Sequence, residues 1–247
     1  MRICYVADGA SIHTQRWVNY FSRKGHEVHL ICWKFMPGYD ENVHVHLLTR
    51  LAPGMWAISQ YLSAILWIFQ TRRLVKKIRP DIVDGHFVTV YGFLAACSGF
   101  HPLVVTAWGS DVLVQPKQNP LSKFTARYAG KKADMIVCLF PIDVAKQHIS
   151  ELGIDSNKLR TILLGVDTAE FDPCHRNEET RQGLGIDSAQ PMVISTRALA
   201  PIYNVETLVK AIPLVLAETP QAQFVIAGTG RQQGYLEELA RDLGVSN

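Results

Sequence analysis

The sequence predicts an α/β protein in which a doubly wound parallel sheet is followed by the first part of a second unit of the same kind. Short apolar runs of strand length alternate with amphipathic segments of helical length along the 247 residues. Polar residues directly follow most of the predicted strands. In a parallel sheet such residues lie at one edge, which is where ligands bind.

The composition is that of a soluble globular protein, with 48% hydrophobic and 19% charged residues. A net charge of +3 is too small to indicate nucleic acid binding. The five cysteines lie far apart without a C-x-x-C pair, which indicates reduced cysteines in the cytoplasm. Residues 1–6 lead directly into a strand, so no signal peptide is expected.

Seven strands are predicted in the first unit, with helices in most of the intervals. A strand over 3–7 leads through a polar turn into a helix over 14–24. The further strands are expected at 27–32, 43–47, 81–84, 103–107, 133–139 and 159–164, and the further helices at 54–79, 91–97, 121–131 and 144–152. His44 and His46 share one face of the third strand, but with no carboxylate or cysteine nearby we expect a solvated face and no metal site.

The second unit opens with the β-branched run 193–196, which predicts a buried strand. A polar loop with Arg197 follows, and Asn204 stands where the N-cap of the next helix is expected. The strand 224–227 then leads into Gly228-Thr229-Gly230. Strand, loop, helix, strand and glycine-rich turn are the layout of a nucleotide-binding βαβ unit. A guanidinium just past the first of these strands suits a diphosphate, because its fork of donors matches phosphate oxygens.

The segments 195–199, 203–208 and 226–230 resemble the donor domain of family 4 glycosyltransferases, and the opening of the chain resembles the start of the same enzymes. The resemblance implies a GT-B-like fold, in which two Rossmann-like domains face each other across a cleft. It implies an acceptor-side domain over 1–170 and the first part of a nucleotide-sugar donor domain over 171–247. It also implies a metal-independent transfer that retains the anomeric configuration.

Candidate site residues follow from strand ends and from the resemblance. Asp8, His86, Ser110, Asp111 and Asp167 each follow a predicted strand, although a histidine in a loop is often a surface residue and Asp111 could cap the next segment. The resemblance implies catalytic roles for His86, Asp111 and Arg197, and acceptor-side positions for His86, Trp108, Ser110 and Asp111. Many relatives carry histidine in place of Trp108, whose indole cannot accept a proton and is excluded as a general base.

The donor is expected to contact residues of both units. These residues are Gly9, Thr14, Gln15, Arg197, Tyr203, Gly228 and Gly230. In the first loop, residues 11–16 replace the paired glycines that the family often has, which leaves Thr14, Gln15 and the helix N-terminus for phosphate contact. Tyr203 falls where relatives have a lysine, so Arg197 would carry more of the stabilisation of the leaving group.

The segment 54–79 is the most apolar of the chain, and its dense part is too short to cross a bilayer. Within the same segment, five basic residues follow the dense apolar part: Arg72, Arg73, Lys76, Lys77 and Arg79. Two interpretations stay open, a core helix with a charged end and a helix that also rests reversibly on an anionic membrane surface.

The expected function is a hexosyltransferase-like glycosyltransferase of glycan or cell envelope polysaccharide biosynthesis, in the cytoplasm or at the cytoplasmic face of the membrane. A nucleotide-diphosphate sugar is its donor, a glycan or lipid-linked molecule its acceptor, and no cofactor is needed. The family's donor domain continues to a pair of glutamates beyond Gly230, so the chain alone is expected to be a truncated, inactive fragment. The alternatives are a non-catalytic Rossmann-type nucleotide-binding module and a dinucleotide-dependent oxidoreductase, although no G-x-G-x-x-G follows the first strand. The oligomeric state stays open.

Overall fold

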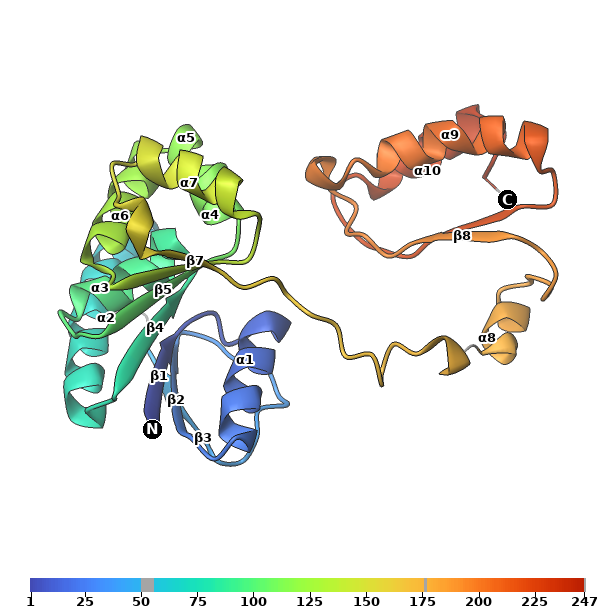
Figure 1. Ribbon diagram of the computed structural model, residues 1–247. Helices are drawn as coiled ribbons and strands as arrows, with labels where there is room; N and C mark the ends of the chain where they lie inside the picture. Colours follow the sequence, from blue (N-terminus) through green and yellow to red (C-terminus); the bar gives the residue numbers. More distant parts are fainter. Residues whose placement is uncertain (50–55, 176, 247) are drawn as a thin grey trace. The chain divides into compact units, whose positions relative to one another are not determined.

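The computed structural model describes residues 1–49, 56–175 and 177–246. The chain divides into two compact units, Met1–Gly165 and Val166–Asn247 (Figure 1). The boundary expected near residue 170 lies just inside the second of these units. Each unit is described below by itself.

Unit 1 is built on a seven-stranded parallel sheet with the strand order β3-β2-β1-β4-β5-β6-β7. The strands are β1 (Arg2–Val6), β2 (Glu27–Cys32), β3 (Val43–Leu47), β4 (Ile82–His86), β5 (Leu103–Ala107), β6 (Met135–Cys138) and β7 (Leu159–Thr161). The chain winds outward from β1 in one direction and then from β4 in the other, which confirms the predicted doubly wound sheet.

Helices cover both faces of this sheet (Figure 1). The helix α1 (Ile12–Arg23) packs on one face over β1, β2 and β3. The other face is covered by α2 (Trp56–Ile78), α3 (Phe93–Cys97), α6 (Pro120–Lys132) and α7 (Ile142–Glu151), which share one buried cluster with alternate strand residues. The short helices α4 (Ser110–Leu113) and α5 (Gln115–Gln118) follow β5, and the π-helical turn Val88–Gly92 follows β4.

Several predicted strand boundaries in unit 1 are wrong, and the ends of β4 and β7 show the physical reason. β4 continues to His86 instead of ending at Asp84, because His86 pairs in register with Thr106 of β5. β7 ends at Thr161, and residues 162–164 are exposed although they are apolar. Apolar character alone does not extend a strand that has no neighbour to pair with.

The parallel pairing of β2 with β3 also changes the interpretation of the histidines on β3. His44 lies opposite His29 of β2, and Glu27 lies on the same face two residues earlier. The expectation that no carboxylate lies near these histidines is therefore wrong. The carboxylate is distant in the sequence, and the sheet brings it close.

The described part of α2 begins at Trp56, so residues 54 and 55 of the expected helix lie outside the described residues. Val75 and Ile78 are buried against the sheet, whereas Phe69 is 67% exposed on the outer side. None of the helices among the described residues is both long enough and apolar enough to cross a membrane.

Unit 2 contains two parallel strands, β8 (Met192–Ser195) and β9 (Gln223–Ile226). Its helices are α8 (Glu178–Gly183), α9 (Val205–Glu218) and α10 (Gln233–Asp242), and its buried cluster comprises Leu199, Val205, Val209 and Leu236. The strand expected to be buried, β8, has Val193 39% and Ile194 53% exposed. A two-stranded sheet offers too little surface to bury both faces of a strand.

The helix α9 begins where Asn204 predicts, but the expected capping contact is absent at its described N-terminus. Asn204 has a left-handed backbone with φ of 50°, and its side chain accepts a hydrogen bond from the Thr207 hydroxyl (3.0 Å) instead of from a backbone N–H. Asn tolerates this conformation better than most residues. It therefore starts the helix through its backbone conformation.

Gly85 fixes how closely the π-helical turn and α3 approach the sheet. A Cβ atom at Gly85 would lie 2.7 Å from the Cα of Gly92 and 2.8 Å from the Cβ of Ala95. Both neighbours belong to packed backbone or core, so neither can move without shifting the turn.

We predict that Gly85→Ala lowers the free energy of unfolding of unit 1 by about 1–3 kcal/mol, because a methyl group is forced into a filled space. Urea unfolding followed by circular dichroism measures the change. Gly165→Ala is the matched control, since nothing lies within 4 Å of a Cβ at that position. Equal midpoints for the two variants would contradict the close approach.

Candidate active site

The turns after β1, β4 and β5 lie side by side at the carboxyl edge of the sheet in unit 1. Register pairs Val6 with Gly85 and His86 with Thr106, so the chain leaves the sheet at the same level in all three strands. This edge also contains the switch point between β1 and β4, from which the two directions of winding start. Open α/β sheets bind ligands at such a point.

His86 is 2% exposed and is enclosed by aromatic rings. Its ring centroid lies 5.4 Å from that of Tyr5, 5.5 Å from that of Trp17 and 5.6 Å from that of Trp108. Trp108 in turn contacts the exposed ring of His13, at 4.8 Å between centroids. Successive rings thus lead from the surface at His13 to the buried imidazole.

A carboxylate beside His86 defines what this imidazole can do. The Nε2 atom lies 3.3 Å from Oδ2 of Asp84, whose Oδ1 accepts a hydrogen bond from the Thr106 hydroxyl (2.9 Å). Among the described residues, Nδ1 of His86 has no hydrogen-bond partner. With the proton assigned to Nε2 by its carboxylate neighbour, Nδ1 carries a lone pair and can accept a hydrogen bond or a proton.

Asp111 is fully buried, and its carboxylate accepts hydrogen bonds from three backbone N–H groups. The donors are Val88 (2.7 Å), Trp108 (3.0 Å) and Gly109 (2.9 Å). Burial raises the pKa of Asp111, and the backbone donors oppose that rise. The carboxylate joins the loop after β4 to the loop after β5, so the structure places it as a positioning residue for Trp108, and a direct role in catalysis stays a prediction.

Phe87, between His86 and Val88, adopts a strained backbone with φ of 69°. Positive φ is rare for a bulky side chain and is tolerated where the surroundings hold it. Here the N–H of Phe87 donates to the carbonyl of Thr106 (2.9 Å), and the next N–H donates to Asp111. The strain lies directly beside the histidine of the candidate site.

Gly9, Thr14 and Gln15, expected at the donor, have partners within unit 1. The carbonyl of Gly9 accepts from the N–H of Met36 (3.0 Å) and the hydroxyl of Tyr39 (2.9 Å). Thr14 is buried, and the side-chain amide of Gln15 donates to the carbonyl of Pro37 (2.8 Å). Gly9 and Gln15 thereby anchor the segment after β2 to the sheet edge. Ser110, expected on the acceptor side, is exposed.

In unit 2, Arg197 lies in the loop after β8 with its guanidinium over the ring of Tyr203. The guanidinium carbon lies 4.8 Å from the ring centroid, and both side chains are exposed. Among the described residues, no carboxylate forms an ion pair with Arg197. Tyr203 therefore supplies a flat surface that orients the guanidinium and leaves its donors available.

The glycine turn after β9 is interlocked with this arginine loop. A Cβ atom at Gly228 or Gly230 would clash with the carbonyl oxygens of Arg197 and Leu199 respectively. The N–H of Leu199 donates to the carbonyl of Thr229 (2.9 Å), which joins the two loops. The two glycines are thus needed to let the backbones approach, whatever the loop binds.

Sequence reasoning missed several residues of these sites. Asp84 and His86 stand two apart in one strand and so share a face, a signal that the shorter predicted strand concealed. The contacts of Trp17 and Thr106 with this pair, and of His13 with Trp108, depend on strand register and helix packing. A separate hollow of about 530 Å³ lies between α5, α6 and α7 and is lined in part by Lys117, Lys123, His148 and Glu151. No sequence motif links these helices.

Comparison with known families gives two matches. Residues 2–139 match the family described as glycosyl transferase 4-like, and residues 176–247 match the family described as glycosyl transferases group 1. An uncharacterized glycosyltransferase of Methanocaldococcus jannaschii is 34% identical over 97% of this chain and 64% of its own length. A GDP-mannose-dependent monoacylated alpha-(1-6)-phosphatidylinositol monomannoside mannosyltransferase of Corynebacterium glutamicum is 36% identical over 32% of this chain and 21% of its own length. The chain spans from 21% to 64% of the curated relatives that it matches.

Solved structures share the fold at low sequence identity. Sucrose-phosphate synthase from Thermosynechococcus elongatus has a TM-score of 0.71 at 15% identity, covering 99% of this chain and 68% of that one. Anabaena HepE in complex with UDP-glucose has a TM-score of 0.71 at 15% identity, covering 100% of this chain and 67% of that one. These similarities confirm the predicted GT-B-like fold class.

We predict that Asp111→Asn lowers the free energy of unfolding of unit 1 by about 2–3 kcal/mol, because an amide N–H₂ replaces one acceptor oxygen and faces a backbone donor. Urea unfolding gives the change, and near-ultraviolet circular dichroism reports whether Trp108 keeps its packing. The control is Asp143→Asn, an exposed carboxylate in the first turn of α7. A loss no larger than that of the control would show that the three hydrogen bonds do not hold the loops.

Proposed function

Given that the chain belongs to the glycosyl transferase 4-like family, we propose that the protein transfers a sugar from a nucleotide-diphosphate sugar to a glycan or lipid-linked acceptor with retention of the anomeric configuration. In this reaction the bond between the anomeric carbon and the diphosphate oxygen breaks. A bond from the same carbon to the acceptor oxygen forms, the acceptor hydroxyl loses its proton, and the nucleoside diphosphate leaves. The retention is implied by the resemblance to retaining enzymes.

The observation that carries the proposal is the oriented guanidinium of Arg197 at the carboxyl end of β8, which forms no ion pair with a carboxylate of the described residues. A departing diphosphate gains negative charge as the glycosidic bond breaks, and a planar fork of N–H donors stabilises that charge. The N-terminus of α9 follows in the same loop and adds the positive end of a helix dipole. In this proposal side chains and backbone neutralise the diphosphate, and no metal or cofactor takes part.

The names of relatives support a diphosphate sugar without fixing its base. Two curated relatives, from Corynebacterium glutamicum and Mycolicibacterium smegmatis, are named as GDP-mannose-dependent enzymes. The Anabaena HepE structures contain UDP or UDP-glucose. The diphosphate is what these donors share, which is the group that Arg197 suits.

Unit 1 would supply the acceptor side through His86 and its ring neighbours. Asp84 holds Nε2 of the imidazole, so Nδ1 is the atom that would accept the hydrogen bond of an acceptor hydroxyl. Because His86 is 2% exposed, the rings of His13 and Trp108 must move for such contact. Asp111 would act indirectly, by holding Trp108 in place.

Two exposed basic surfaces of unit 1 fit a lipid-linked acceptor at the cytoplasmic face of a membrane. α2 and α6 both contact α3 and cover the same face of the sheet. Each presents an exposed aromatic ring, Phe69 or Phe124, together with exposed lysines and arginines. The basic residues are Arg72, Arg73, Lys76 and Lys77 on α2 and Lys123, Arg127, Lys131 and Lys132 on α6. Apolar side chains within a basic surface favour reversible binding to anionic lipid.

We predict that Arg197→Ala weakens binding of the nucleoside diphosphate by about 2 kcal/mol or more, roughly 30-fold, because a charge-assisted pair is lost. Calorimetric titration with UDP and with GDP measures the affinity. Tyr203→Phe keeps the ring under the guanidinium and should preserve affinity, whereas Tyr203→Ala should weaken it. Arg241→Ala, an exposed arginine at the end of α10, is the control. Unchanged affinity in Arg197→Ala would remove this residue from the donor site.

We also predict that the protein sediments with vesicles containing anionic phospholipid at low salt. Each basic side chain near the surface contributes about 1 kcal/mol, so Lys76→Glu/Lys77→Glu should reduce binding at least about tenfold. Lys24→Glu, directly after α1 on the other face of the sheet, should bind like the unchanged protein. Binding that persists in high salt or in the double variant would contradict this docking surface.

A further inference from the structure

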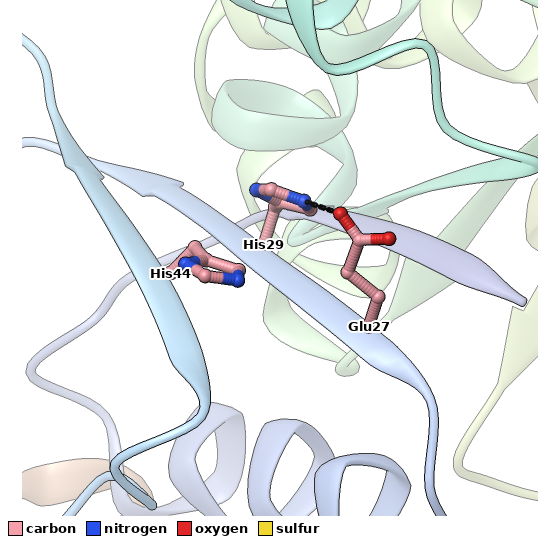
Figure 2. A group of neighbouring side chains, drawn as sticks. All are labelled: Glu27, His29 and His44. Atoms are coloured by element: carbon pink, nitrogen blue, oxygen red, sulfur yellow. Dashed lines mark hydrogen bonds and ion pairs between the residues drawn. The ribbon is translucent and has the colours of Figure 1, made fainter.

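A second cluster of chemically reactive side chains lies away from the candidate active site. Glu27 and His29 come from β2 and His44 from the neighbouring β3 (Figure 2). They stand near the amino ends of these strands, whereas His86 ends β4 at the carboxyl edge. Glu27, His29 and His44 lie on the same face of the sheet as Ile31, which is buried under α2. His86 instead contacts Tyr5, on the face that α1 covers. The cluster is therefore at the opposite edge and on the opposite face.

The geometry of this cluster suits a divalent metal ion. One ligand atom from each of Glu27, His29 and His44 lies within 4.8 Å of the others, and the Nε2 of His29 is 3.1 Å from Oε1 of Glu27. Tetrahedral zinc with ligand distances of about 2.0–2.2 Å brings its ligand atoms to roughly 3.3 Å from one another. The rings of His29 and His44 are stacked at 4.8 Å between centroids, so metal binding requires the exposed side chains of His44 and Glu27 to turn toward the ion, while His29 is buried and fixed.

A hydrogen bond behind His29 prepares this imidazole as a ligand. Its Nδ1 lies 3.0 Å from Nε2 of His46, the next histidine on the same face of β3. In the metal-free protein the proton on Nε2 faces Glu27, and a metal ion at Nε2 would displace it. Zinc-bound histidines usually donate their second ring nitrogen to a hydrogen-bond acceptor, which fixes the tautomer and the ring orientation, and Nε2 of His46 would be that acceptor here.

Arg2 of β1 and His29 both hydrogen-bond to the carboxylate of Glu27. Both contacts are made to Oε1, which is one of the two oxygens of the Glu27 carboxylate.

We propose that Glu27, His29 and His44 bind a Zn²⁺ ion, with His46 as the positioning residue behind His29. Two neutral imidazoles and one carboxylate are ligands that zinc prefers, and a water molecule would complete four-coordination. The ion joins the edge strand β3 to β2 and so stabilises that side of the sheet. The site is independent of sugar transfer, because it lies on the other face and at the other edge from His86.

The test is a titration of the metal-free protein with Co²⁺, whose visible absorption reports coordination by nitrogen and oxygen ligands, followed by displacement with Zn²⁺. One equivalent per chain is expected, and zinc should raise the thermal unfolding midpoint. His44→Ala and Glu27→Gln should each weaken binding by at least about tenfold and abolish the thermal shift. His46→Phe removes only the hydrogen-bond partner of His29 and should weaken binding by about 10–100-fold.

The matched control is His101→Ala. His101 is also exposed and lies 2.7 Å from a carboxylate oxygen of Asp134, but that pair has no second imidazole in its described surroundings. Its substitution should leave the metal affinity unchanged. Circular dichroism verifies that the variants fold, which is expected because Glu27 and His44 are exposed. Absence of saturable binding at one equivalent, or equal affinity in His44→Ala and the unchanged protein, would overturn the proposal.

Discussion

The carboxylate of Asp111 joins the two loops on which the candidate active site of unit 1 depends. Its hydrogen bonds with the N–H groups of Val88, Trp108 and Gly109 fix the chain after β4 and after β5 at the same time. The buried carboxylate has lost its contacts with water, and the three N–H donors replace them. Removing the carboxylate would leave these buried N–H groups without an acceptor. The strained backbone at Phe87 and the ring of Trp108 over His86 are both held by this contact.

Unit 2 arranges its candidate donor site by backbone approach and ring stacking. The glycines at 228 and 230 allow the turn after β9 to lie against the loop after β8, and Tyr203 orients the guanidinium of Arg197. Tyrosine at this position thus has a role that a lysine would not have, because a ring can support a planar cation.

The parallel sheet of unit 1 keeps two sets of polar side chains apart, at opposite edges and on opposite faces. Polar residues after the strands meet at the carboxyl edge, where His86, Trp108 and the loops held by Asp111 lie. The pairing of β2 with β3 collects Glu27, His29, His44 and His46 near the amino ends. Since alternate residues of a strand face opposite sides, two sets of polar groups can occupy one sheet without contact between them.

The sequence by itself determined the alternation of strands and helices, the parallel sheet, and the loop after β8 in which Arg197 stands, because these follow from local patterns of apolar and turn residues. Only the tertiary structure decided which side chains meet. It placed Asp84 and Thr106 beside His86, engaged Gly9 and Gln15 in packing, exposed β8, and brought Glu27 and His29 to His44. Register between strands and the burial of each face arise from contacts between residues distant in the chain, which no local pattern contains.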